Sequence, residues 1–192
     1  IVELAGVKDA FVGDAMHPFS LADKPFPVVD DVQGDEMQKK IAEAHAHGDS
    51  VGGVIECVAS GMPAGIGNPF FDTVEGCLAQ MMFAIPAVKG VEFGKGFDVV
   101  RSCGSENNDS PIFVDGKLTH RTNNAGGIEG GITNGMPVVM RCAFKPTPSI
   151  YSKQETVNLK TKENVELEIT GRHDPCIVPR AVPVVESAMA IV

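Results

Sequence analysis

The sequence predicts an α+β fold in which helices and short strands are mixed along the chain. Three observations support this class. The 192 residues include 21 Gly and 13 Pro, which divide the chain into short elements. Predicted strands and helices follow one another without the βαβ rhythm of a doubly wound parallel sheet. Two strand-like segments, 112–114 and 117–119, flank Asp115-Gly116, a strong antiparallel hairpin signal.

Hydrophobic spacing defines the expected elements of the first half. We expect, in order, a strand near 1–4, a loop to residue 33 with Pro18, Pro25 and Pro27, a helix over 35–47, a strand over 50–60, a turn-rich loop over 61–69, a helix from 72 or 73 to about 84, a strand over 88–93 and helical turns over 97–103. Met37, Ile41 and Ala44 fall at helical spacing. Asp72 or Thr73 is suited to cap the second helix.

The second half is expected to begin with the 112–119 hairpin. After it we expect a Gly-rich stretch over 123–135, a strand over 137–144, a polar segment over 151–164, a strand over 165–169 and a helix over 182–192. Pro175 disfavours the α region for the residue before it, so Asp174 is expected in a turn and not on a helix surface.

Composition limits the classes of function. The chain is 43% hydrophobic and 21% charged, as expected for one globular domain spanning residues 1–192. No apolar run approaches the roughly 20 residues that cross a bilayer, and no signal segment precedes the first strand. A net charge of −9 argues against broad nucleic-acid binding, although a few local cations could still hold a phosphate. We therefore expect a cytoplasmic protein with neither membrane nor nucleic-acid partners.

Cysteine and histidine spacing gives no metal or disulfide pattern. The five cysteines are widely spaced, without a C-x-x-C pair, which favours reduced thiols. His45 and His47 are two residues apart, whereas ligands on one helix face are three or four apart, so we expect no metal site. The chain starts at Ile1 and stops within an apolar run ending at Val192, so we interpret it as an internal fragment.

Three segments carry candidate chemistry. Gly171-Arg172-His173-Asp174-Pro175-Cys176 presents a guanidinium, an imidazole and a carboxylate on a proline-stiffened turn, which suits anion binding and proton transfer; the alternative is a surface turn. The Gly-rich stretch can bring bare backbone to a ligand or serve as a connector. Lys145-Pro146-Thr147-Pro148-Ser149 joins a cation and two hydroxyls on a stiff backbone; the alternative is a plain exit from the sheet.

Together with three further motifs, these segments resemble the chorismate synthase family. The further motifs are Gly48-Asp49-Ser50-Val51-Gly52-Gly53, Gly61-Met62-Pro63-Ala64-Gly65-Ile66-Gly67 and Ala87-Val88-Lys89-Gly90-Val91-Glu92-Phe93-Gly94. The resemblance runs in the family's order from about residue 48 to the end. Family chains are roughly twice this length, so the resemblance implies a C-terminal-side fragment.

The resemblance implies a carbon–oxygen lyase of the shikimate pathway of aromatic amino acid biosynthesis. It would convert 5-enolpyruvylshikimate 3-phosphate to chorismate and phosphate by anti 1,4-elimination, with reduced FMN as a required cofactor. It also implies a homotetramer and a β-α-β sandwich whose antiparallel sheets enclose helices. The family's catalytic histidines and most substrate-binding arginines have no counterpart here, so the fragment is expected to be inactive alone.

Position by position, the resemblance implies a set of site residues. Asp174 would be catalytic, and Arg172 would contact both substrate and FMN. The other implied FMN contacts are Pro86, Ala87, Gly130, Lys145, Pro146, Thr147, Pro148 and Ser149. Many relatives have Asn where this chain has Pro86. Two other possibilities stay open at this point: a non-catalytic phosphate- or nucleotide-binding module, and a structural piece in which Gly and Pro serve only packing.

Overall fold

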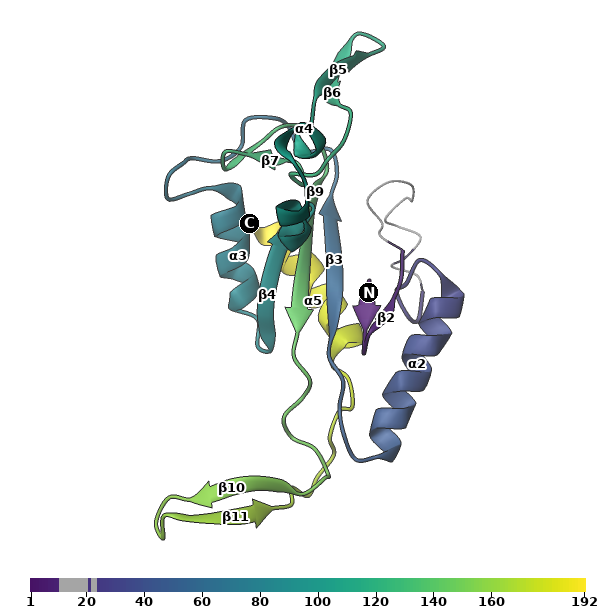
Figure 1. The fold of residues 1–192 in the computed structure, drawn as a ribbon, viewed down its shortest axis with the longest axis vertical. Coiled ribbons are helices and arrows are strands. Elements are labelled where there is room, and N and C mark those ends of the chain that lie inside the picture. The colour runs from purple at the N-terminus through teal and green to yellow at the C-terminus, as the bar shows by residue number, and fades with distance from the viewer. Residues whose placement is uncertain (11–20, 22–23) are drawn as a thin grey trace.

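A five-stranded antiparallel sheet forms the centre of the molecule (Figure 1). The computed structural model describes residues 1–10, 21 and 24–192. The strand order is β2-β1-β3-β9-β4, with β1 at Glu3–Leu4, β2 at Val7–Lys8, β3 at Gly53–Ala59, β4 at Val88–Phe93 and β9 at Val138–Phe144. β9 pairs with β3 along its whole length, from Val138↔Ala59 to Phe144↔Gly53. This long central strand therefore sets the distance between the two ends of the sheet.

Two helices cover one face of the sheet and make the core with it. α3 (Val74–Phe83) packs on β4, α5 (Val178–Ile191) packs on β3, and the two helices contact each other. Met140 and Cys142 alternate along β9 and are fully buried in this core. Side chains at alternate positions of a strand share a face, so Arg141 points to the opposite face. α2 (Asp31–Ala46) lies beside β2 at the sheet edge.

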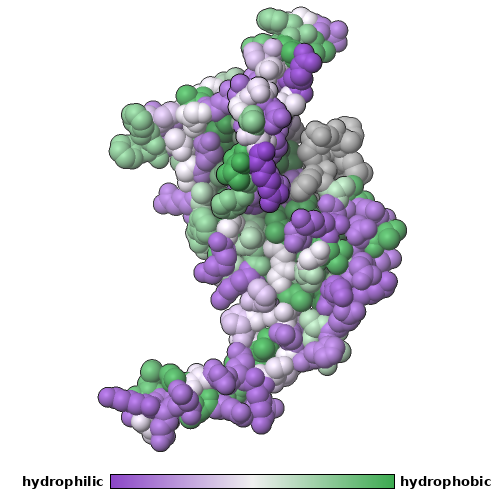
Figure 2. Space-filling model, in the orientation of Figure 1, coloured by the Kyte–Doolittle hydropathy of each residue, from purple (hydrophilic) through white to green (hydrophobic). Residues whose placement is uncertain are grey.

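Shorter elements extend beyond the ends of the sheet. The 3₁₀ helix η2 (Gly96–Arg101) and helix α4 (Gly104–Asn107) follow β4. The other strands in the described part of the chain form three hairpins: β5 (Pro111–Val114) with β6 (Lys117–His120), β7 (Ile128–Glu129) with β8 (Ile132–Thr133), and β10 (Gln154–Asn158) with β11 (Glu163–Leu167). β5–β6 and β10–β11 project at opposite ends, and both show hydrophobic side chains among hydrophilic ones (Figures 1 and 2).

The structure confirms the α+β class and most of the expected elements. The strand over 88–93 and the hairpin around Asp115-Gly116 are present, and Thr73 caps α3 by accepting a hydrogen bond from the Gly76 amide. The helix expected over 35–47 begins earlier, at Asp31, because the Asp30 side chain caps it. The predicted loop position of Pro18 lies outside the described residues. No helix in the described part of the chain is both long and apolar enough to cross a membrane.

Two predicted boundaries were wrong for identifiable reasons. The last helix starts at Val178, not at 182, because Pro179 occupies its first turn, where no backbone N–H donor is needed. The polar segment 151–164 contains a strand, β10, because its backbone pairs antiparallel with β11. The Gly-rich stretch likewise contains β7 and β8, joined by Gly130 and Gly131, both at positive φ.

Candidate functional site

The segment 145–149 leaves the central sheet beside the segment that enters it. β9 ends at Phe144, and the Lys145 amide then donates a 3.0 Å hydrogen bond to the Ala87 carbonyl, one residue before β4. Ala87 adopts a φ of 74°, a left-handed conformation that non-glycine residues rarely hold. The structure therefore brings Pro86 and Ala87 together with Lys145 at one end of the sheet.

This end of the sheet offers polar groups that have no partners in the described part of the chain. The Lys145 side chain is exposed, and no carboxylate pairs with its ammonium. The Thr147 hydroxyl oxygen is buried and makes no hydrogen bond with any described residue. Buried polar atoms are normally hydrogen-bonded, so this hydroxyl is a candidate to bind a ligand. A cation beside such a hydroxyl suits an anionic ligand.

Asp174 lies in the turn that precedes α5, as the sequence predicted. Its carboxylate accepts a 3.1 Å hydrogen bond from the Cys176 amide and pairs with the guanidinium of Arg180 in the first turn of α5. The Asp174 side chain is 29% exposed, so solvent or a ligand can reach it. Burial raises the pKa of the neighbouring Cys176 thiol, which disfavours a thiolate there.

An open hollow of about 690 Å³ adjoins this turn. Its lining includes Arg172, His173, Asp174, Arg180 and Tyr151. Tyr151 packs edge-on against the His173 ring, with ring centroids 4.6 Å apart. The Arg172 side chain is exposed and has no ion-pair partner among the described residues. The hollow therefore combines an available guanidinium with an oriented carboxylate.

The loop between α2 and β3 joins these two groups of residues. The Ser50 hydroxyl donates a 2.6 Å hydrogen bond to the Thr147 carbonyl. The next amide, that of Val51, donates a 2.8 Å hydrogen bond to the Pro175 carbonyl. The 145–149 segment and the Asp174 turn are thus held through one short stretch of chain.

Gly130 lies at the other end of the sheet. It forms the β7–β8 turn, and the carbonyl of its neighbour Gly131 accepts a hydrogen bond from the Val74 amide at the start of α3. Lys145 follows the far end of β9, whose seven residues separate the two ends by about 20 Å. The structure therefore does not bring Gly130 together with the other predicted residues. A Cβ added to Gly130 would meet no atom within 4 Å.

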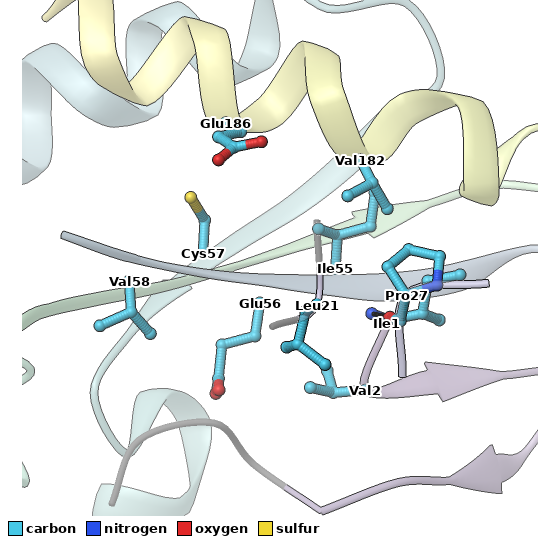
Figure 3. Close-up of a pocket in the computed structure, with 10 residues that line it drawn as sticks. All are labelled: Ile1, Val2, Leu21, Pro27, Ile55, Glu56, Cys57, Val58, Val182 and Glu186. Carbon is cyan, nitrogen blue, oxygen red and sulfur yellow. Dashed lines mark hydrogen bonds between the residues drawn. The ribbon is translucent and has the colours of Figure 1, made fainter. Parts of the chain in front are cut away.

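Two other hollows contain none of the predicted site residues. The pocket in Figure 3 adjoins β3 and is lined from both sides of this strand, by the N-terminal segment and by α5; its lining includes the carboxylates of Glu56 and Glu186. The Cys57 sulfur faces Glu186 there, and burial raises the pKa of this thiol to about 11. Negative charge makes this pocket a poor phosphate site. A second hollow, of about 420 Å³, is lined partly by Lys95 and Arg121.

Sequence reasoning counted Arg180 only among the cations that could hold a phosphate and gave Ser50 no role, so it missed the contacts that both residues make. Arg180 is six residues after Asp174 and is separated from it by two prolines, so no helical or strand spacing indicated the pair. Ser50 is 97 residues before Thr147, and only the fold brings them into contact. The Gly48–Gly53 motif was the available signal, but motif resemblance alone assigned it no role.

Loops at one end of an antiparallel α+β sheet carry Lys145 and Arg172, which have no ion-pair partner among the described residues. This arrangement suits an anionic ligand and belongs to a class of fold distinct from the doubly wound nucleotide-binding folds. The family model described as chorismate synthase matches residues 3–192. The chain therefore belongs to the chorismate synthase family.

Individual relatives agree with the family assignment. The chain is 51% identical over 191 residues to a chorismate synthase of Archaeoglobus fulgidus, covering 99% of this chain and 53% of the relative. It is 55% identical over 154 residues to one of Korarchaeum cryptofilum, covering 80% and 43%. A solved structure titled "Crystal Structure of Chorismate Synthase" matches with a TM-score of 0.65 and 36% identity, covering 82% of this chain and 40% of that one. The chain spans about half the length of the curated relatives it matches.

Proposed function

We propose that this chain is the cofactor- and substrate-holding part of a cytoplasmic chorismate synthase. The complete protein would eliminate phosphate from 5-enolpyruvylshikimate 3-phosphate to give chorismate, a lyase reaction of the shikimate pathway. One observation carries the proposal: the family model covers residues 3–192, and curated relatives at about half identity bear this name. Because the chain spans about half the length of its curated relatives, the activity is proposed for the complete protein.

The proposed cofactor is reduced FMN, and the residues at the Lys145 end of the sheet fit its phosphate side. Lys145 offers an ammonium without a carboxylate partner in the described residues, and Thr147 offers an unsatisfied buried hydroxyl. Pro146 and Pro148 limit the backbone entropy lost on binding, while Ser149 adds a second hydroxyl. When bound, reduced FMN supplies electron density to the elimination.

Arg172 and Asp174 are the proposed substrate-side residues. The exposed Arg172 guanidinium can hold a phosphate or carboxylate oxygen pair in its planar fork. Asp174 would assist the transfer of the proton that leaves the substrate. Arg180 would hold the Asp174 carboxylate in one orientation. The hollow beside them is open enough to admit a small anionic ring.

Gly130 requires a separate proposal because of its place in the fold. A flavin held at Lys145 lies about the length of β9 from Gly130 of the same chain. We therefore assign Gly130 to a flavin held by another copy in a homotetramer, where bare backbone permits close approach. Gly130→Val should weaken FMN binding at least tenfold. Because the φ of 59° disfavours a β-branched residue, circular dichroism on the same sample checks that the variant is folded. A folded variant with normal FMN affinity would remove Gly130 from the site.

The test of the function is turnover by the complete protein. With chemically reduced FMN and no oxygen, it should form chorismate and inorganic phosphate in equal amounts from 5-enolpyruvylshikimate 3-phosphate. Omitting the flavin should abolish both products. Binding of FMN or phosphate without any turnover would instead support a non-catalytic binding module.

A further inference from the structure

The stretch Gly48–Gly52 lies between the two loops of the candidate site but contributes none of the residues assigned to ligands. It connects α2 to β3. At its start, the Gly48 carbonyl accepts hydrogen bonds from the Tyr151 and Ser152 amides, at 3.0 and 3.1 Å. The stretch is thereby fastened to the chain that follows the 145–149 segment.

Ser50 connects this stretch to the 145–149 segment through a side-chain hydrogen bond. Its hydroxyl donates to the carbonyl of Thr147, the central residue of the segment, at 2.6 Å. Ser50 is half-buried, so water competes poorly for this bond. The bond anchors a backbone that otherwise leaves the sheet as a loop.

The residue after Ser50 is tied to the other loop. The Val51 amide donates to the carbonyl of Pro175, next to Asp174, and the Val51 side chain packs against the core. Gly52 then lies so close to the end of β9 that an added Cβ would overlap the Phe144 carbonyl oxygen. Three successive residues therefore set the spacing between the Lys145 segment and the Asp174 turn.

We propose that Ser50 is a positioning residue that holds the Thr147 backbone, and with it the Lys145 and Ser149 side chains, in register with the Asp174 turn. This inference rests on the proposed function, because it assigns the 145–149 segment to FMN. Ser50 itself touches no ligand. It acts through the Thr147 carbonyl, so its removal should loosen the segment and leave the chemical groups in place.

The test compares Ser50 variants of the complete protein by FMN titration, which follows flavin fluorescence. Ser50→Ala and the nearly isosteric Ser50→Cys should both raise the Kd for FMN about 2- to 12-fold, as expected for one lost hydrogen bond. Ser50→Thr keeps the hydroxyl and should restore wild-type affinity. Ser152→Ala is the matched control: its hydroxyl donates to the His47 and Gly48 carbonyls, outside the 145–149 segment, so affinity should stay within twofold.

The outcomes separate this inference from the function on which it rests. A purely structural role would lower the melting temperature of Ser50→Ala and Ser50→Cys without changing FMN affinity below that temperature, and would overturn the inference alone. An equal loss of FMN affinity in Ser152→Ala would also overturn the inference. If the unaltered protein binds no FMN, both the function and the inference fail. If Ser50→Ala does not fold, Ser50→Cys decides the matter because it keeps the packing.

Discussion

Removing the Lys145 ammonium should weaken FMN binding without destabilising the protein. Lys145 is exposed and has no ion pair or side-chain hydrogen bond with described residues, so Lys145→Ala breaks no polar side-chain interaction among them. A charge-assisted hydrogen bond contributes about 1.5–3 kcal/mol. The Kd for FMN should therefore rise by about 10- to 150-fold. The free energy of unfolding should change by less than about 0.5 kcal/mol, as for ordinary surface substitutions.

Flavin fluorescence titration of the complete protein measures this effect directly. Lys160→Ala is the matched control, because Lys160 lies in the exposed β10–β11 turn and its removal changes the net charge equally. The Kd of this control variant for FMN should stay within twofold of that of the unaltered protein. Raising the salt concentration should reduce the difference in FMN affinity between Lys145→Ala and the unaltered protein, since mobile ions screen an exposed charge pair.

Two results would refute the reasoning. Unchanged affinity in a folded Lys145→Ala protein would show that the flavin phosphate does not bind at this end of the sheet. A similar loss in Lys160→Ala would show that overall charge, and not a local contact, attracts the ligand.

Three further predictions test packing, chemistry and thiol reactivity. Gly52→Ala should lower the free energy of unfolding in urea by about 1–3 kcal/mol, because the added Cβ overlaps the Phe144 carbonyl oxygen. Gly104→Ala, at a position with open space, should change it by less than about 0.5 kcal/mol. Equal effects of the two substitutions would contradict the close contact at Gly52. Asp174→Ala should lower kcat by roughly 10²–10⁴ with little change in FMN affinity, and an unchanged kcat would remove its proton-transfer role. At pH 8 a thiol reagent should label the exposed Cys103 quickly and the half-buried Cys57 hardly at all, since a pKa of about 11 leaves Cys57 about 0.1% thiolate. Rapid labelling of Cys57, located by mass spectrometry, would contradict its raised pKa.

Local signals in the sequence predicted much of the fold. Thr73 and the apolar residues after it define α3, and Asp115-Gly116 defines the β5–β6 hairpin, because caps and two-residue turns depend on adjacent residues. β10 was missed because its residues are mostly polar and its identity as a strand depends on pairing with β11. Tertiary pairing of this kind overrides local propensity.

The candidate site was predictable only in part. Lys145 and Asp174 were identified because cations and carboxylates beside prolines form recognisable local patterns. Their connection through Ser50 and Val51 was not, since the two hydrogen bonds join residues 97 and 124 positions apart in the sequence. The separation of Gly130 from Lys145 was not predictable from the sequence either, because it depends on the length of β9 between them. Long-range geometry of this kind is absent from single-sequence patterns.

The most direct test of the account is the position of FMN in a crystal structure of the complete protein. We predict the flavin phosphate within hydrogen-bond distance, about 3 Å, of the Lys145 ammonium and beside the hydroxyls of Thr147 and Ser149. Asp174 of the same chain should face the substrate side of the flavin ring. FMN bound instead in the pocket of Figure 3 or in the hollow beside Lys95 and Arg121 would contradict the assignment of the site.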